Sequence, residues 1–384
     1  MHVVVIGAGV VGASIAAGLT ARGAQVTLVE RDWPGAGTSA TSFAWINSNG
    51  KEPQAYYEIN AAGVRAHHEL AGDGAPWLVP NGHLEYATAP EHRERLRGRM
   101  QRLTDRGYPV RELTHAEAAQ LEPDLLIPAG CDTIAFFPEE AHVYPSRYLA
   151  QMLGRAVDAG AVLRARTEVV GLEPDGAGAR VTLGDGSVLQ ADAVVSAAGR
   201  WSAELGRLAG VTVPMAEFTS PGDVTVGYLL ETGPLPVRVD RLITSPRLNI
   251  RPDGGGRLLL QALDLDVTAD PGTVPELASE LSTAVLDRLR EVVRHTGSAE
   301  VRRLVVGQRV MTADGYTTVG PVPGAEWLYV VATHSGVTLA PLLGERVAAE
   351  VLGGDEPLFA DFRLGRFVAG AAISAPVPRR PGEQ

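Results

Sequence analysis

Short apolar runs alternate with glycine-rich turns over the first thirty residues. Residues 2–6 are mostly β-branched and apolar, which predicts a buried strand. A helix is predicted next, because Ile15 and Leu19 share one face before Gly23 ends the pattern. Residues 25–30 again read as a strand. This strand–helix–strand order predicts an α/β fold built on a parallel sheet.

The rest of the chain divides into helix-like and strand-like stretches. A strand-rich stretch runs from about residue 213 to 305, and short strands are expected between residues 162 and 196 and over residues 327–332. Helices are expected over about residues 53–72, 91–106, 145–160, 274–295 and 339–352. The alternation predicts an α/β unit joined to a second, strand-rich unit.

The turn after the first strand carries the sequence G-A-G-V-V-G at residues 7–12. Gly7 permits the tight turn, Gly9 lets the backbone approach a pyrophosphate, and Gly12 lets the helix pack closely on the strand. Glu30 ends the second strand, where a carboxylate can accept the hydroxyls of an adenosine ribose. The complete strand–turn–helix–strand context indicates a dinucleotide site rather than a helix start with incidental glycines.

Length, charge and cysteine content narrow the class of protein. With 384 residues the chain exceeds one ordinary hydrophobic core, so two joined domains are expected. A net charge of -11 disfavours nucleic-acid and anionic-membrane partners. Cys131 is the single cysteine, and the absence of zinc-like Cys/His spacing predicts no metal site. No apolar run is long enough to span a membrane, so we expect a cytoplasmic monomer or homodimer.

Four further motifs follow the glycine motif in order. They are T-S-F-A at 41–44, D-A-V-V-S-A-A-G-R-W at 192–201, R-V-M-T-A-D-G at 309–315 and H-S-G-V-T-L-A-P at 334–341. Together with the glycine motif and Glu30, they resemble the D-amino-acid oxidase superfamily of FAD enzymes. That superfamily includes glycine oxidase, monomeric sarcosine oxidase and the D-amino-acid dehydrogenases, and the resemblance spans the whole chain.

The resemblance implies that FAD is the cofactor and that it is bound non-covalently. The sarcosine-oxidase branch attaches FAD through a cysteine whose place here is Gly307. The final helix would direct its positive N-terminal end at the pyrimidine edge of the flavin. The cofactor-binding residues implied are Gly7, Gly9, Val11, Gly12, Glu30, Arg31, Thr41, Ser42, Phe43, Ala44, Val169, Ala198, Gly199, Trp201, Gly336, Val337 and Thr338.

Four side chains are candidates for the catalytic site. Arg309 matches the family arginine that binds a substrate carboxylate, with a structural salt bridge as the alternative. Arg251 is a second candidate cation, although its position also suits a surface strand. His334 lies beside the expected flavin edge, or is an ordinary loop histidine. Tyr56 would cover the site or pack in the core.

The resemblance implies an oxidoreductase that oxidises the C–N bond of a small amino acid or secondary amine to an imine, by hydride transfer to flavin. Oxygen or another carrier would then accept the electrons. A flavin-dependent monooxygenase and an FAD-binding subunit of a larger flavoprotein complex are the alternatives. We expect a discontinuous FAD-binding Rossmann-type domain of residues 1–48, 140–213 and 305–384. Residues 49–139 and 214–304 would form a strand-rich substrate domain.

Overall fold

The computed structural model describes residues 1–367 and 375–376. Its first layer is a six-stranded sheet in the order β19-β20-β13-β1-β2-β9, in which only β19 pairs antiparallel. The strands are β1 (His2–Ile6), β2 (Gln25–Val29), β9 (Val162–Arg164), β13 (Ala193–Ser196), β19 (Thr318–Val322) and β20 (Ala325–Ala332). The expected α/β fold with a parallel sheet is therefore confirmed.

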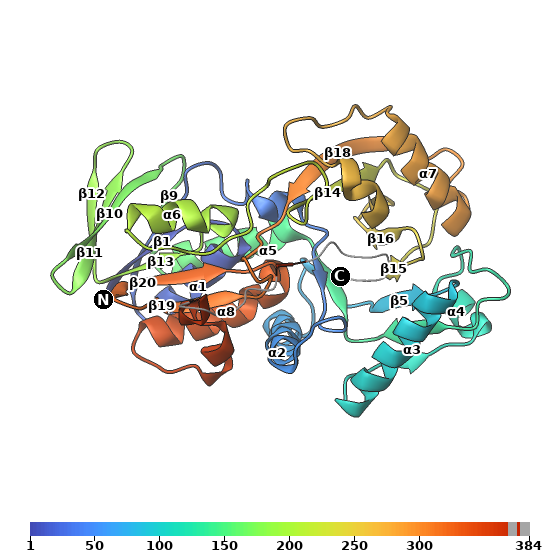
Figure 1. The fold of residues 1–384 in the computed structure, drawn as a ribbon, viewed down its shortest axis with the longest axis horizontal. Coiled ribbons are helices and arrows are strands. Elements are labelled where there is room, and N and C mark those ends of the chain that lie inside the picture. Colours follow the sequence, from blue (N-terminus) through green and yellow to red (C-terminus); the bar gives the residue numbers. More distant parts are fainter. Residues whose placement is uncertain (368–374, 377–384) are drawn as a thin grey trace.

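Long helices pack against one another beside this sheet (Figure 1). They are α1 (Val10–Ala21), α2 (Gln54–Ala71), α5 (Pro145–Asp158) and α8 (Gly336–Val351). The first and last cross closely, since a Cβ atom on Gly18 would lie 1.9 Å from the carbonyl oxygen of Gly344. Their shared core includes Ile15, Leu19 and Leu343. This crossing places two helix N-termini, from opposite ends of the sequence, at the same edge of the sheet.

The second layer is an eight-stranded mixed sheet in the order β18-β14-β17-β16-β15-β5-β7-β6. Its strands come from two separate stretches of chain. They are β5 (His83–Tyr86), β6 (Arg111–Glu112), β7 (Ile134–Phe137), β14 (Val226–Thr232), β15 (Leu242–Thr244), β16 (Asn249–Pro252), β17 (Leu258–Gln261) and β18 (Val301–Gln308). The parallel pairing of β5 with β15 joins the two stretches.

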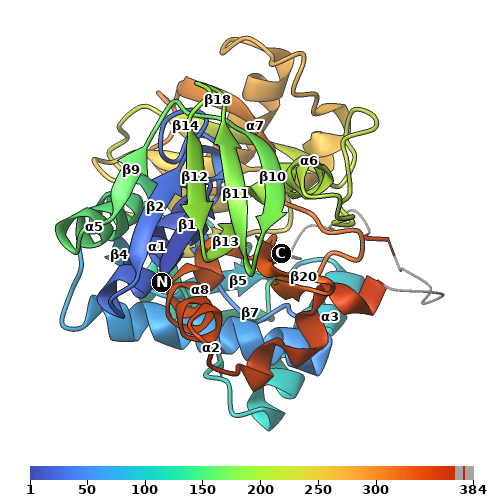
Figure 2. The same ribbon diagram turned by 90° about the vertical axis from the view of Figure 1, so that its left-hand side faces the viewer.

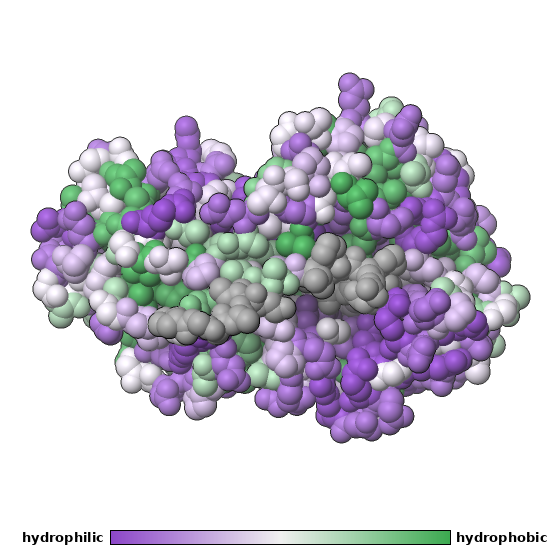
Figure 3. Space-filling view, in the orientation of Figure 1, coloured by the Kyte–Doolittle hydropathy of each residue, from purple (hydrophilic) through white to green (hydrophobic). Residues whose placement is uncertain are grey.

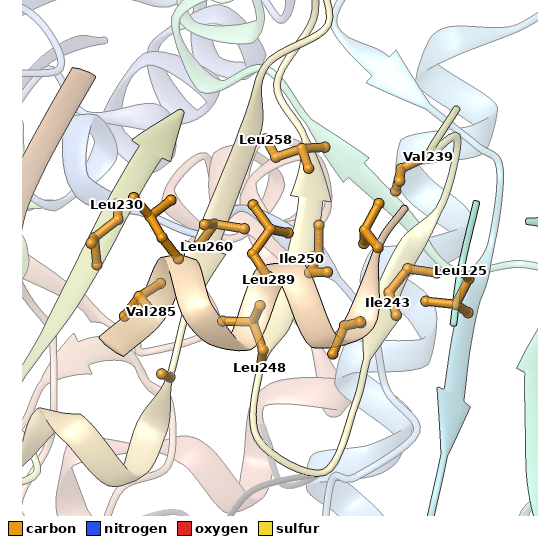
Figure 4. Packing of buried hydrophobic residues seen from close by; sticks show 14 of the residues in the cluster. Leu125, Leu230, Val239, Ile243, Leu248, Ile250, Leu258, Leu260, Val285 and Leu289 are labelled. Carbon is orange, nitrogen blue, oxygen red and sulfur yellow. The ribbon is translucent and has the colours of Figure 1, made fainter. Parts of the chain in front are cut away.

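We call the part built on the six-stranded sheet the first lobe and the part built on the eight-stranded sheet the second lobe. Helices and short sheets complete both lobes. Val285 and Leu289 of α7 (Glu280–Val292) pack with Leu230, Ile250 and Leu260 of the eight-stranded sheet (Figure 4). The other helices are α3 (Pro90–Asp105), α4 (His115–Leu121) and α6 (Ser202–Leu208). One three-stranded sheet contains β3 (Trp45–Ile46), β4 (Leu78–Val79) and β8 (Ala141–Val143), and the other, prominent in Figure 2, contains β10 (Val169–Asp175), β11 (Gly178–Leu183) and β12 (Val188–Ala191).

Some expected boundaries differ from the observed ones. The helix expected from residue 274 begins at Glu280, because the Ser279 side chain accepts a hydrogen bond from the Ser282 amide and caps it. The α2 helix, assigned from sequence to the substrate segment 49–139, packs against α8 of the first lobe. The boundary expected at residue 305 falls inside β18. The last part of the segment 305–384, residues 368–374 and 377–384, lies outside the described residues.

The surface of the second lobe is largely hydrophilic around helix α3. In Figure 3 hydrophilic residues cover much of the lower part of this lobe, where Figure 1 places α3. That helix buries only Leu96, Met100, Leu103 and His92 and carries Arg and Glu side chains elsewhere.

Of the described helices, none combines the length and apolar character that crossing a bilayer requires.

Candidate functional site

A long cleft lies at the carboxyl ends of the parallel strands, where open α/β sheets bind their ligands. The loops that follow β1, β2, β13 and β20 all contribute to its walls. Residues far apart in sequence, including Gly9, Val169, Gly199 and Gly336, line this one cleft. The implied cofactor residues Gly7, Val11, Glu30, Arg31, Ser42, Ala198, Trp201 and Val337 line it as well.

The glycine turn has the geometry that a dinucleotide requires. Gly7 has a φ of +101°, and its amide donates to the Val29 carbonyl at 2.8 Å. A Cβ atom on Gly12 would lie only 1.8 Å from the Gly7 oxygen, so the helix can pack here only without a side chain. Gly9 lines the cleft, where an added Cβ would meet the Ser39 Oγ at 3.1 Å. The backbone is therefore exposed to a ligand at the start of α1.

Glu30 is fixed at the edge of the cleft by the backbone around it. Its carboxylate accepts hydrogen bonds from the amides of Ala8, at 2.8 Å, and Asp32, at 3.0 Å. These bonds hold an anionic acceptor beside the glycine turn, where the ribose hydroxyls of an adenine dinucleotide would lie. The donor and acceptor groups of this end of the cleft thus fit FAD.

Positive charge collects on the same cleft around one indole ring. The guanidinium carbons of Arg31 and Arg200 lie 3.9 Å and 3.7 Å from the centroid of Trp201. Burial, assisted by the charge of Arg31, lowers the pKa of Arg200 to about 10. Arg200 therefore stays charged at neutral pH and can balance part of the charge of a diphosphate.

A second cavity continues from the cleft and reaches the eight-stranded sheet. We call it the chamber. Thr38, Ser42, Val310, His334 and Val337 line both spaces, so the two are contiguous. Of the implied site residues, Thr41, Ser42, Phe43, Ala44, Val337, Thr338, Arg309 and His334 line the chamber. It therefore lies where the first turn of α8 faces β14, β17 and β18 of the second lobe.

Arg309 lines the chamber and also forms structural contacts with neighbouring residues. Its Nη1 donates to the carbonyls of Val224, at 3.1 Å, and Val226, and its Nη2 donates to Asp266 at 2.9 Å. Burial raises the pKa of the Asp266 carboxyl above its usual value, although the Arg309 charge opposes that effect. A guanidinium has five N–H donors, so two hydrogens, on Nε and Nη2, lie outside these contacts.

Arg251 and Tyr56 are not brought to the chamber wall. The Arg251 guanidinium is buried, donates to the Val143 carbonyl at 2.9 Å and pairs with Asp253, beside a different cleft. Tyr56 joins the core of the first lobe, and its hydroxyl forms a hydrogen bond of 2.8 Å with Ser335. Arg251 is thus held by its own neighbours, and the Tyr56 hydroxyl contacts the chamber wall at Ser335.

Lys51 lies on the chamber wall and was not singled out by the sequence reasoning. Its residue is only 7% exposed, and its ammonium lies 5.8 Å from the centre of the Tyr56 ring. The signal that could have identified it is compositional. The 34 basic residues comprise 33 arginines and this single lysine, so a chain that otherwise uses arginine keeps one lysine at the chamber.

The first turn of α8 is supported from behind by α2. The Nε2 of His67 lies 2.8 Å from the Val337 carbonyl oxygen and donates to it. Burial lowers the pKa of His67 to about 4, so the ring is neutral at physiological pH. Because Val337 lines both cavities, His67 acts on the site through the backbone of α8.

Gly307 stands where the sarcosine-oxidase branch has the cysteine that attaches FAD, so this position gives the chamber no thiol. Gly307 lines it, and a Cβ atom there would lie 2.9 Å from the Thr41 carbonyl oxygen. Cys131 is buried in the core of the second lobe. Within the described part of the chain, no group of three or more His, Cys, Asp or Glu side chains could hold a metal ion.

The fold and the cleft define a dinucleotide-binding protein, and comparison with known proteins gives its family. The profile of the FAD dependent oxidoreductase family, DAO, matches residues 2–350. The chain therefore belongs to this family, within the D-amino-acid oxidase superfamily, and its cofactor is FAD. It is an FAD-dependent oxidoreductase.

Individual relatives cover nearly the whole chain. Glycine oxidase of Geobacillus kaustophilus is 28% identical over 97% of this chain and 98% of its own. D-proline dehydrogenase of Pyrobaculum islandicum is 27% identical over 92% of this chain and 96% of its own. The crystal structure of the Geobacillus kaustophilus glycine oxidase aligns with a TM-score of 0.83 and 27% identity, covering 95% of this chain and 98% of that one.

Proposed function

We propose that this protein oxidises the C–N bond of a small amino acid held in the chamber. The observation that carries the proposal is a cationic chamber that opens directly into the FAD cleft. Arg309 and Lys51 line it, and among the described residues no Asp or Glu does. Such a chamber favours a ligand with a carboxylate.

FAD supplies the redox chemistry when bound, accepting two electrons as the substrate amine becomes an imine. The turn at residues 7–12 and Glu30 would hold its adenosine diphosphate half, since they line the cleft with exposed backbone and a fixed acceptor. The amides of Gly336, Val337 and Thr338, at the positive end of α8, would face its ring.

The chain's own residues then orient the substrate. Arg309 has two N–H groups outside its contacts with Asp266 and the backbone, and we assign these to the carboxylate side of the substrate. His334 lines both the cleft and the chamber, so it can influence the protonation of the substrate amine. Apolar side chains of Phe43, Leu229 and Leu263 limit the remaining space.

The relatives named above support a small substrate, because their names specify glycine and D-proline. The chamber wall by itself does not select one amino acid, because most of its side chains are apolar or uncharged. Oxygen or another carrier would take the electrons from the reduced cofactor.

Anaerobic mixing tests this function. The holoprotein is mixed with glycine, sarcosine, proline enantiomers and alanine enantiomers, each matched with the amine that lacks the carboxylate, and the flavin absorbance is followed. At least one amino acid should bleach the flavin, and its matched amine should bleach it far more slowly. Bleaching by a reduced nicotinamide cofactor alone would instead indicate a monooxygenase. Bleaching that requires a second protein would indicate a subunit of a larger complex.

A further inference from the structure

Trp45 contributes the largest side chain of a small part of the chamber wall. It is the first residue of β3, is 8% exposed and lines the chamber. Its ring packs in one apolar cluster with Phe43 and Leu229, which lie on the same wall. The chamber has a volume of about 110 Å³. Because an apolar cavity of about 150 Å³ holds a single benzene molecule, the space beside the indole suits only a short side chain.

The backbone that carries this indole is fixed on both sides. Ala44 has a φ of +57°, in the left-handed region that a residue with a side chain rarely adopts. Its amide donates to the Ser42 Oγ at 3.0 Å, and its carbonyl accepts from the Val143 amide at 3.0 Å. The Trp45 carbonyl accepts from the Thr338 Oγ1 at 3.4 Å. These bonds determine where the indole leaves the backbone.

A buried carboxylate holds the far edge of the indole. Glu140 is 0% exposed, and its Oε2 accepts a hydrogen bond of 2.8 Å from the Trp45 Nε1. Its Oε1 accepts one of 3.0 Å from the Tyr108 hydroxyl. Burial, reinforced by the charge of Glu140, raises the pKa of Tyr108, so this hydroxyl keeps its proton and donates. Because a buried carboxylate is stable only when it is hydrogen-bonded, Glu140 and its two donors hold one another in place.

Other rings confine the indole behind the wall. The His83 ring centroid lies 4.4 Å from that of Trp45, and His83 is itself stacked on Phe137 with their planes 12° apart. Neither Glu140 nor His83 is among the described residues that line the chamber. Both therefore act on the chamber through Trp45. An indole confined in this way cannot turn to another rotamer to make room for a longer ligand.

We propose that the Trp45 indole limits the length of the substrate side chain and that Glu140 is the residue that positions the indole. This inference rests on the proposed amino-acid oxidation and deepens it, because it restricts the substrates to amino acids with short side chains. One additional methylene that a pocket cannot accommodate changes relative rates about 10- to 200-fold. A fixed ring at the wall is therefore sufficient to separate neighbouring members of a homologous series.

A series of side-chain lengths provides the test. The holoprotein is mixed anaerobically with straight-chain amino acids from alanine to norleucine, as both enantiomers, and the second-order rate constant for flavin bleaching is measured. The wild type should favour the shortest members. Trp45→Phe has a smaller ring that cannot bond to Glu140, so it should raise the rate for long members relative to alanine on the order of tenfold.

Variants of the carboxylate test its positioning role. Glu140→Met removes the acceptor and should also relax the length preference, whereas Glu140→Gln keeps an acceptor and should retain it. Tyr108→Phe is the matched control, because it removes the other donor to Glu140 without changing the bond to Trp45. It should keep the wild-type preference. Combining Glu140→Met with Trp45→Phe should relax the preference no further than Trp45→Phe alone, since Glu140 acts through the indole.

An unchanged length preference in Trp45→Phe would overturn the proposal, and additive effects in the double variant would overturn the role of Glu140. Should Glu140→Met fail to fold, Trp45→Phe and Glu140→Gln decide, because the first breaks the hydrogen bond and the second keeps it. Equal preferences in those two variants would contradict the proposal.

A binding measurement separates this inference from the proposed function. If no amino acid bleaches the flavin, the carboxylic acids from acetate to hexanoate are titrated into the oxidised holoproteins, and the change in flavin absorbance gives each Kd. A length limit that relaxes in Trp45→Phe would then retain the Trp45 wall and reject the proposed oxidation. A limit that is the same in Trp45→Phe and the wild type would reject both.

Discussion

Among single residues, two basic side chains, Arg309 and Lys51, line the chamber from different parts of the chain. Arg309 pairs with Asp266 and donates to the backbone carbonyls of Val224 and Val226, which ties the residue after β18 to the start of β14. Lys51 lies in a loop of the other lobe and faces the same space. Charge alone therefore does not distinguish a substrate-binding side chain from a structural one, and the contacts of each cation must be considered.

Arg309 both lines the chamber and pairs with Asp266, so Arg309→Lys tests the two roles together. The shorter ammonium loses the planar fork, so substrate-dependent flavin reduction should weaken by about 1.5–3 kcal/mol, and FAD content should stay unchanged. Stopped-flow reduction at several substrate concentrations measures this effect. A rate and an apparent affinity that both match the wild type would exclude a role in substrate binding. A large drop in Tm with normal kinetics would leave only the ion pair with Asp266.

Gly9 tests the cofactor end of the site. In Gly9→Val the added side chain would project toward the Ser39 Oγ, which an added Cβ alone would approach to 3.1 Å, and would occupy the space that a pyrophosphate needs. The variant should purify as folded, colourless protein. Absorbance at the flavin bands together with circular dichroism checks both properties. A yellow variant with a full complement of FAD would show that the backbone here is not the phosphate contact.

At the scale of elements, the site depends on where α8 begins. Its first turn lines both cavities, and α2 fixes that turn through the hydrogen bond from His67 to Val337. The helix also crosses α1 at Gly18 and Gly344 without intervening side chains. Two helix N-termini are thereby held at one cleft, which is the arrangement that a dinucleotide with a redox-active ring requires.

The buried imidazole makes this support sensitive to acid. The pKa of His67 is about 4 in the folded protein, against an ordinary 6.5. The unfolded chain therefore binds the proton more readily, and stability should fall as pH decreases from about 6.5 to about 4, by at most about 1.4 kcal/mol per pH unit for this group. In His67→Gln, which keeps a donor for Val337, the fall should be shallower.

Thermal unfolding across that pH range measures the difference between the two proteins. His115→Gln, at an exposed histidine of the second lobe, serves as the matched control and should follow the wild type. Identical pH profiles for His67→Gln and the wild type would mean that the ring is not held neutral by the fold.

In the molecule as a whole, one cleft gathers residues from Ile6 to Val337. FAD bound there would join the loops that follow β1, β2, β13 and β20 and should stabilise the protein as a unit. Removing FAD should lower the Tm, and free FAD at one hundred times its Kd should restore about 2.7 kcal/mol. Calorimetry of apoprotein titrated with FAD provides the measurement. A Tm independent of FAD would contradict a cofactor site that joins these segments.

The cofactor should also leave the protein when the fold is lost. Because Gly307 occupies the place of the attaching cysteine and Cys131 lies in the other lobe's core, acid precipitation should release the flavin into the supernatant. The ratio of flavin in the supernatant to flavin in the pellet decides this directly. Flavin that stays with the pellet would require a covalent bond to some other side chain.

The sequence by itself determined the features that depend on local chemistry. The opening strand, helix and strand followed from apolar periodicity, and the turn followed from Gly7 and Gly12, whose places exclude side chains. The start of α7 was misplaced by six residues because the Ser279 cap, rather than the upstream sequence, sets it. FAD was also predicted, because the glycine motif and the four motifs that follow it are short local patterns whose combination resembles the family.

Only the tertiary structure decided which residues face the chamber. The sequence offered Arg251 and Tyr56 as candidates beside Arg309, yet Arg251 pairs with Asp253 beside another cleft and Tyr56 packs in a core. Lys51 and Arg309 are separated by more than two hundred residues and share one wall because the two lobes meet there. Such proximity depends on how β14, β17 and β18 pack against α8 and the loop after β3, and no local pattern encodes long-range packing.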